Sequence, residues 1–510
     1  MMKKFTGIDF GMHNLKVCHF NGTRNMRVDL EGNSQSSSKA VANTVYYYEN
    51  EESILNALFF DAQQAKEEGK WENPDYVRYI KRELQKENSY RSFCNGKYHF
   101  SAMKIINDIF KQIAFKMEET GFDTTAPVIL TAPVVFSEAQ KQKLKYCAEK
   151  AGFFVQEVIT EPFAVLFSEE FSEECIDSTE EESYVLILDM GSSTIDICLF
   201  RIRNEEDDHI LVETMGSTGL SFGGKDITDM IADFIGENER IQDEMQKRGF
   251  DAESTRADLF EFAEQLKNEL YEEEDVPETD SRDFYGEKFV LKRTNVDKIL
   301  NDSGIWKKIE TMIEEMFDSL DEPVDYEDIT KLVMTGGTSR IQYFRDKAEN
   351  LFPEAEIIGD PEEEDTVYCS VSSGAVNYAK NENIEIRNSS PMCVGISCGN
   401  GFQKALNQNS FYYLRGKRNA VSRSWLEAND WKIKVYQTLR PVRERTNVEH
   451  EDIYYSGYFQ LQKELYPTDE DIIYLSVYCT PLGISAETAS GDDLKNYIES
   501  ELNLTMEVSL

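Results

Sequence analysis

The chain has 510 residues, with 95 acidic and 54 basic side chains and a formal net charge of −41. This length exceeds what one hydrophobic core usually supports, so two or three domains are expected. The negative charge argues against nucleic acid and anionic lipid as partners, and the sequence has no run of about 18 apolar residues that would predict a membrane span.

The cysteines and the N-terminus indicate the compartment. The nine cysteines form no Cys-x-x-Cys pair, which favours reduced thiols over disulfides or a zinc site. The chain reaches Asp9 too early for the apolar core of a signal peptide. A soluble, cytoplasmic protein is expected.

An internal repeat is the first motif along the chain. Residues 8–20 align without gaps on residues 188–200, and Asp, Gly, Cys and Phe recur at matching places. Each copy predicts a strand, a tight turn at Asp-x-Gly and a returning strand, which together form a β-hairpin.

The residues of these turns suit phosphate and a metal. Gly11 and Gly191 have no Cβ, so a ligand can approach the backbone closely. Hydroxyl and N–H donors for phosphate follow the second glycine, at Ser192, Ser193 and Thr194. Asp9 and Asp189 provide carboxylates that could hold a hydrated Mg²⁺.

Two further glycine pairs precede predicted helices. Gly336-Gly337 lies between a buried strand pattern and a helix pattern, with Thr338 or Ser339 expected as N-cap. Gly223-Gly224 comes directly before a second helix pattern. Together with the hairpins, these turns predict a cleft between two lobes.

These motifs, in this order, resemble the heat-shock-protein-70 chaperones of the DnaK type, within the actin-like ATPase superfamily. The resemblance is carried by residues 7–11 and 189–196 (phosphate motifs), 336–341 (adenosine motif), and 132–140 and 160–164 (connecting segments). It implies an α/β fold with a two-lobed actin-like ATPase domain of duplicated ribonuclease-H-like lobes, followed by a small all-β sandwich.

The domain boundaries follow from the same resemblance. Residues 1–380 would form the nucleotide-binding domain, 381–390 a polar linker, and 391–510 a β-sandwich that resembles a substrate-binding domain. Alternating residues at 431–436 and 472–478 predict strands of this sandwich, and Gly399-Asn400-Gly401 predicts a hairpin turn. No helical lid is expected, because the chain stops shortly after Val508.

The resemblance also implies an ATP-dependent chaperone involved in the stress response. ATP or ADP with Mg²⁺ would bind in the cleft, and slow hydrolysis would be coupled to binding of unfolded or extended polypeptide by the β domain. J-domain and nucleotide-exchange co-chaperones would be further partners.

The resemblance also implies a role for individual residues at matching positions. The implied catalytic residues are Lys81, Glu161, Asp189 and Thr194, and the implied metal residues are Asp9 and Asp189. The implied nucleotide contacts are Gly11, Met12, His13, Asn14, Gly191, Ser192, Ser193, Thr194, Gly223, Gly224, Glu264, Lys267, Asn268, Tyr271, Gly336, Gly337, Thr338 and Arg340.

The residues themselves allow other interpretations. Lys81 could be a surface lysine, Glu161 a helix cap before Pro162, and Glu264 and Lys267 part of a solvated helix face.

The sequence also departs from the family pattern. Met12 and His13 replace two threonines, so hydrolysis would be slower or altered; His13 is either a donor to phosphate or a neighbour without a role. Asn268 replaces an arginine and Tyr271 a serine, and the Tyr271 ring could stack on the base instead. A nucleotide-binding scaffold with little hydrolysis is therefore the alternative function.

Overall fold

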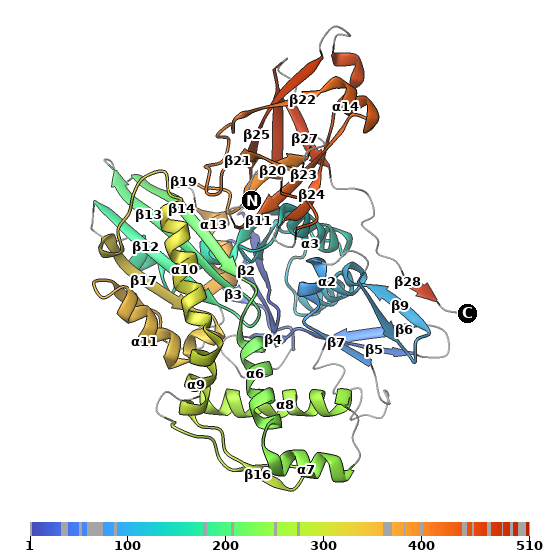
Figure 1. Cartoon of the computed structure of the whole chain (residues 1–510), viewed down its shortest axis with the longest axis vertical. Helices are drawn as coiled ribbons and strands as arrows, with labels where there is room; N and C mark the ends of the chain where they lie inside the picture. The colour runs from blue at the N-terminus through green and yellow to red at the C-terminus, as the bar shows by residue number, and fades with distance from the viewer. Residues whose placement is uncertain are drawn as a thin grey trace.

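The computed structural model contains two α/β lobes and a β domain that lies against both (Figure 1). It describes residues 3–31, 39–49, 54–58, 75–85, 89–176, 181–205, 209–248, 252–272, 276–360, 370–381, 383–397, 401–440, 446–450, 453–466, 471–481, 483–489, 493–497 and 506–508. Within these residues, no helix has the length and apolar character needed to cross a membrane.

Five strands of each central sheet follow the same order, and the lobe II sheet has a sixth strand at its edge. Lobe I has the order β11-β10-β1-β2-β3, and lobe II has β18-β17-β12-β13-β14-β19. Lobe I contains β1 (Phe5–Phe10), β2 (Asn14–Phe20), β3 (Asn25–Arg27), β10 (Val128–Ala132) and β11 (Val155–Thr160), with β4 (Val41–Ala42) beside β2. Lobe II contains β12 (Glu182–Met190), β13 (Ile195–Glu205), β14 (His209–Leu220), β17 (Ile329–Thr335), β18 (Glu356–Ile358) and β19 (Ile384–Arg387). In each lobe the first two strands are antiparallel and the first strand is parallel to its other neighbour, which confirms the predicted duplication.

Helices surround these sheets. Lobe I carries α2 (Ala102–Glu119), α3 (Glu138–Lys150) and the 3-10 helix η1 (Ile80–Gln85). Lobe II carries α6 (Gly224–Gly236), α7 (Glu239–Arg248), α8 (Ala252–Leu270), α9 (Arg293–Ser303), α10 (Ile305–Asp318), α11 (Gln342–Leu351), η3 (Tyr326–Asp328) and η4 (Gly337–Arg340). Of the remaining helices, α4 (Glu161–Leu166) and α13 (Ser370–Lys380) pack on each other, and α5 (Ser172–Cys175) follows α4.

The start of α2 shows how the sequence specifies a helix. Ser101 is its N-cap, and the Ser101 hydroxyl accepts a 3.1 Å hydrogen bond from the Lys104 amide. Ile105, Ile109 and Ile113 are spaced by four residues and are fully buried in the core of lobe I. This core supports η1, which carries Lys81.

Small sheets lie at the edges of the lobes. They are β5 (Thr44–Glu49), β6 (Ile54–Leu58) and β7 (Asp75–Arg78); β8 (Tyr90–Phe93), β9 (Tyr98–Ser101) and β28 (Met506–Val508); and β15 (Arg282–Phe284) with β16 (Glu287–Phe289). Strand β28 is the last described segment, yet it pairs antiparallel with β9 of lobe I, far from the β domain (Figure 1).

The β domain contains eight strands in the order β21-β20-β23-β24-β27-β26-β25-β22. Its elements are β20 (Cys393–Ser397), β21 (Phe402–Leu406), β22 (Arg418–Ser422), α14 (Arg423–Ala428), β23 (Lys432–Thr438), β24 (Tyr454–Gln460), η5 (Lys463–Leu465), β25 (Ile472–Thr480), β26 (Gly483–Thr488) and β27 (Asp493–Tyr497). The strands predicted at 431–436 and 472–478 are confirmed as β23 and β25. Gly399 and Asn400 of the predicted turn lie outside the described residues, and β20 and β21 pair antiparallel on either side.

The predicted linker contains a strand. Residues 384–387 form β19, which pairs in parallel with β14 at the edge of the lobe II sheet. Ile384 and Ile386 pack against a buried apolar cluster that includes Val185 and Val212 of the lobe II sheet, because their alternate spacing places both on one face. This segment is therefore part of lobe II in the structure.

Candidate functional site

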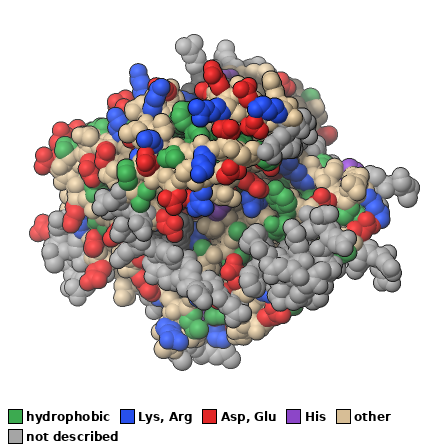
Figure 2. Space-filling view, turned by 90° about the horizontal axis from the view of Figure 1, so that it is seen from below, with side chains coloured by type: hydrophobic (Ala, Val, Ile, Leu, Met, Phe, Trp, Pro, Cys, Tyr) green, Lys and Arg blue, Asp and Glu red, His purple; other side chains and the backbone are tan. Residues whose placement is uncertain are grey.

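A cleft of about 720 Å³ lies between the two lobes. Both Asp-x-Gly hairpins, η1, α8 and the turn at residues 336–341 contribute to its walls. Every site residue predicted from the sequence lines this cleft except Gly223. Seen from below, the molecule is hollowed near the centre of this face, and acidic and basic side chains are interspersed around it (Figure 2).

Gly223 supports the second Asp-x-Gly turn by close backbone packing. A Cβ at this position would lie 2.5 Å from the carbonyl carbon of Ser192, so only glycine allows this approach. The next two amides then bond to the turn: Gly224 N donates to the Gly191 carbonyl at 3.1 Å, and Lys225 N donates to the Ser192 carbonyl at 2.8 Å. The start of α6 thus holds residues 191–192 in place.

The two hairpins present different charges at equivalent positions. Asp9 lies opposite Lys16 in the first hairpin, and Asp189 lies opposite Asp196 in the second. The Lys16 ammonium lies 2.5 Å from Oδ2 of Asp9. Burial, followed by the charge of Glu161, raises the pKa of Asp189 well above its usual value and that of Asp196 to about 7.

Lys81 forms an internal ion pair. Its ammonium donates a 2.8 Å hydrogen bond to Oε1 of Glu161, and it lies 5.5 Å from the centre of the Phe136 ring. Lys81 is only 2% exposed, which excludes the interpretation as a surface lysine. Burial raises the pKa of Glu161, and the Lys81 ammonium opposes this shift.

Glu264, which lines the cleft, receives contacts from lobe I. The Tyr79 hydroxyl donates to Oε1 of Glu264 at 3.1 Å, and Nδ1 of His13 lies 3.9 Å from the same oxygen. Burial lowers the pKa of His13. His13 therefore faces a carboxylate of α8, and Glu264 does not belong to a solvated helix face.

Lys267 is also held inside lobe II. Its ammonium donates to the Gly224 carbonyl at 3.0 Å and to Oγ1 of Thr228 at 2.7 Å. Burial lowers its pKa to about 8. The interpretation of Lys267 as a solvated lysine is therefore wrong.

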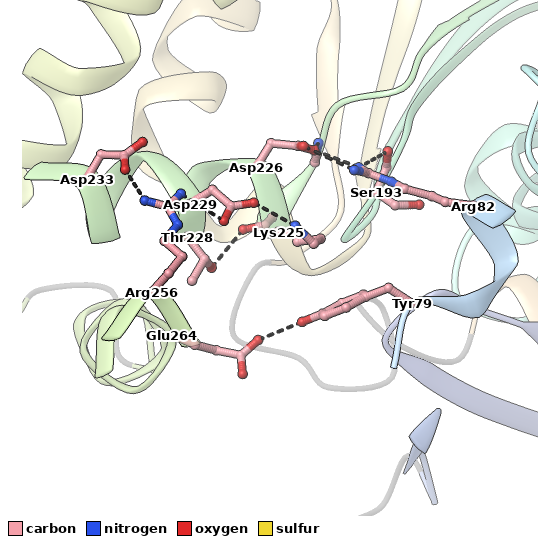
Figure 3. Close-up of polar contacts among 12 residues, drawn as sticks. Tyr79, Arg82, Ser193, Lys225, Asp226, Thr228, Asp229, Asp233, Arg256 and Glu264 are labelled. Atoms are coloured by element: carbon pink, nitrogen blue, oxygen red, sulfur yellow. Dashed lines mark hydrogen bonds and ion pairs between the residues drawn. The ribbon is translucent and has the colours of Figure 1, made fainter. Parts of the chain in front are cut away.

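Arg82 joins the lobes next to Lys81 (Figure 3). Its guanidinium donates two hydrogen bonds to the Asp226 carboxylate, at 2.7 and 3.1 Å, and a third to the Ser193 carbonyl at 2.8 Å. In the same region Lys225 lies 5.6 Å from the centre of the Tyr79 ring. Arg82 of lobe I is thus hydrogen-bonded directly to the second Asp-x-Gly turn.

The residues expected to contact the base also line the cleft. Asn268, Tyr271 and Arg340 line it together. The Arg293 guanidinium lies 5.0 Å from the Tyr271 ring centre and covers one face of the ring, which is 8% exposed. Arg340 donates to the Glu272 carbonyl at 2.8 Å. A base stacked on Tyr271 would therefore have only the other face of the ring available.

The N-cap predicted for the helix after Gly337 is wrong. Neither Thr338 nor Ser339 caps α11, because both lie in η4 and their hydroxyls bond elsewhere. Thr338 donates to the Gly191 carbonyl at 2.8 Å, and Ser339 donates to the Gly336 carbonyl at 2.8 Å. Thr338 therefore links the Gly336-Gly337 turn to the second Asp-x-Gly turn.

Sequence reasoning missed several residues that line the cleft. Lys16, Tyr79, Lys225 and Arg282 are among them. A signal for Lys16 was present in the internal repeat, because it stands at the place of Asp196 and thus reverses the charge there. Tyr79 and Lys225 have no such signal.

Comparisons with known proteins agree with this architecture. The family model described as Hsp70 protein matches residues 65–497. The chain is 24% identical over 317 residues to Chaperone protein dnaK1 of Prochlorococcus marinus subsp. pastoris, covering 60% of this chain and 45% of that relative. It is 22% identical over 451 residues to Chaperone protein DnaK of Cenarchaeum symbiosum, covering 86% of this chain and 65% of that relative. It is 24% identical over 370 residues to Chaperone protein HscA homolog of Vibrio vulnificus, covering 69% of this chain and 54% of that relative. The chain thus spans about half to two thirds of the length of these relatives. Because the family model matches most of the chain, this protein belongs to the Hsp70 family.

Proposed function

We propose that this member of the Hsp70 family binds and slowly hydrolyses ATP in the interlobe cleft, and that this cycle controls binding of extended polypeptide by the β domain. The cleft carries the proposal, because two Asp-x-Gly turns and the buried Lys81–Glu161 pair line one cavity. An ammonium and a carboxylate of this kind can stabilise charge on a terminal phosphate and orient the attacking water.

The phosphates would lie on the second turn, where Ser192, Ser193 and Thr194 line the cleft. For Mg²⁺, Asp189 is the better candidate of the two predicted aspartates. No ion pair to Asp189 is found in the described part of the chain, whereas Asp9 is paired with Lys16. A bound Mg²⁺ would supply positive charge against the phosphates.

Contacts between the β domain and both lobes support the proposed coupling. The Glu138 amide of lobe I donates to Oε1 of Gln437 at 2.7 Å. On lobe II, Oδ1 of Asn409 accepts from the Ser217 amide at 3.0 Å, and Nδ2 of Asn409 donates to the Ser319 hydroxyl at 3.1 Å. A change in the angle between the lobes would strain these contacts and shift the position of the β domain.

The polypeptide is proposed to bind as an extended strand. J-domain and nucleotide-exchange co-chaperones are proposed as further partners on the basis of the family alone.

ATP turnover by the full chain, with and without an unfolded peptide, tests this function. We expect slow turnover that the peptide stimulates, and peptide release that ATP accelerates. Asn409→Gly should keep turnover but lose the stimulation, since glycine suits the positive φ of 58° at this position while the side-chain contacts disappear. Absence of both ATP binding and peptide binding would contradict the proposal.

A nucleotide-binding scaffold with little hydrolysis is the second candidate. Met12 and His13 favour it, because neither offers a hydroxyl beside the first turn. Calorimetry distinguishes the two functions: tight ATP binding without turnover would select the scaffold.

A further inference from the structure

Lys16 is a cation of the cleft that has no role in the function proposed above. Lys16 lies on β2, directly across the hairpin from Asp9. Its ammonium is 2.5 Å from Oδ2 of Asp9, and the two side chains are only 13% and 4% exposed. The charge of Asp9 is therefore neutralised from within the chain.

The second hairpin has no such arrangement. At the repeat position of Lys16 it carries Asp196, which lies opposite Asp189. The first hairpin thus presents one positive and one negative group, whereas the second presents two carboxyl groups. The duplicated hairpins have become electrostatically different.

The Lys16 ammonium acts on other groups of the cleft as well. Burial raises the pKa of both Glu161 and Asp189, and Lys16 opposes the shift in each case. Lys16 is also among the residues that line the cavity. The ammonium therefore borders the space that a bound anion would occupy, next to its pair with Asp9.

A divalent cation at Asp9 would fit this arrangement poorly. Mg²⁺ requires oxygen ligands in near-octahedral geometry, and an ammonium beside Oδ2 occupies that side and repels a dication. A lysine, by contrast, is a common point-charge binder of phosphate.

We propose that Lys16 is a built-in cation of the cleft that neutralises Asp9 and supports the nucleotide phosphates, so that binding of ATP and ADP depends little on Mg²⁺, whereas hydrolysis would still use a Mg²⁺ ion at Asp189. The proposal rests on nucleotide binding in this cleft.

Calorimetric titration of the full chain with ATP and with ADP, in Mg²⁺ and in EDTA, tests it. The unaltered protein should lose less than about fivefold in affinity when Mg²⁺ is removed. Lys16→Met should lose about 10- to 100-fold in EDTA, the range for a charged hydrogen bond, and recover in Mg²⁺ because Asp9 is then free to hold the metal through water.

Three control variants keep the result interpretable. Lys16→Arg retains the charge and should retain binding in EDTA. The double variant Asp9→Asn with Lys16→Met buries no unpaired charge, and should lose binding in EDTA without recovering fully in Mg²⁺. Lys145→Met, at a lysine of α3 that lies 3.9 Å from Glu149, removes a positive charge of the same lobe away from the cleft and should behave like the unaltered protein.

The two possible failures differ. If the unaltered protein binds neither nucleotide in either buffer, the proposed function is wrong. If it binds ATP in Mg²⁺ but loses as much affinity in EDTA as Lys16→Met does, nucleotide binding stands and the role of Lys16 is overturned.

Discussion

The ammonium of Lys81 donates a 2.8 Å hydrogen bond to Oε1 of Glu161 across 80 residues of sequence. Lys81 comes from η1 of lobe I, and Glu161 is the first residue of α4. With Lys81 at 2% exposure, the pair is shielded from bulk water, and each charge depends on the other.

Loss of this pair should reduce turnover more than binding. Lys81→Met should lower kcat about 100-fold with little change in KM, because the lost interaction would act mainly on the transition state. Glu161→Gln should lower kcat less, since an amide oxygen can still accept from Lys81. Steady-state kinetics of both variants and of the double variant measure this, and we expect the double variant to be no worse than Lys81→Met. Unchanged kcat in Lys81→Met would refute a catalytic role.

The contact of Arg82 with Asp226 and the Ser193 carbonyl should control nucleotide release. Arg82→Ala should accelerate ADP dissociation about tenfold, because hydrogen bonds to a charged group between the lobes are lost. Stopped-flow fluorescence with a labelled ADP measures the rate. Arg256→Ala is the matched control, because Arg256 pairs with Asp229 at 3.2 Å inside lobe II (Figure 3). Equal rates in the two variants would contradict a role for the cross-lobe contact.

Stability should depend on pH through Asp196. Burial, and next the charge of Glu161, raises the pKa of Asp196 to about 7. Between about pH 4 and pH 7 the folded protein therefore keeps a proton on Asp196 that the unfolded chain has already released. This contribution to stability is present at low pH and is lost as the pH rises through 7. In Asp196→Asn the amide oxygen can still accept from the Val134 amide, a bond of 2.6 Å in the native protein.

The variant should therefore match the native protein near pH 4 and become more stable than it as the pH rises, by on the order of 2–4 kcal/mol at pH 8. Urea unfolding at the two pH values measures this difference. An equal gap at both pH values would show that Asp196 does not titrate in this range.

Gly223 should be intolerant of a side chain although it does not line the cleft. Its φ of −172° is ordinary extended backbone, so the cost of Gly223→Ala comes from the new Cβ, 2.5 Å from the Ser192 carbonyl carbon. We expect a loss of about 1–3 kcal/mol in the free energy of unfolding and weaker nucleotide binding, measured by urea unfolding and calorimetry. Gly236→Ala, at the other end of α6, should be mild because its nearest neighbour is Cδ1 of Leu259, at 3.3 Å. Native-like affinity in Gly223→Ala would be inconsistent with close support of the turn.

The sequence by itself determined the two hairpins, the glycine turns and the strands of the β domain. These features are local: Asp-x-Gly between alternating strands, or Gly-Gly before an apolar helix pattern, specifies its own conformation. The repetition of one hairpin at residues 8–20 and 188–200 was enough to predict a duplicated fold, and five strands of each central sheet have the same order.

Only the tertiary structure decided which charges meet in the cleft. Arg82 and Asp226 are 144 residues apart, and Thr338 lies 147 residues from the Gly191 carbonyl that it contacts. Nothing near these positions in the chain indicates the partner, because each pair depends on how the lobes close. The polar segment around Ile384 likewise becomes β19 because β14 offers a free sheet edge. Local patterns specify elements through backbone conformation, whereas the charge balance of the cleft depends on distances that exist only after the lobes have packed.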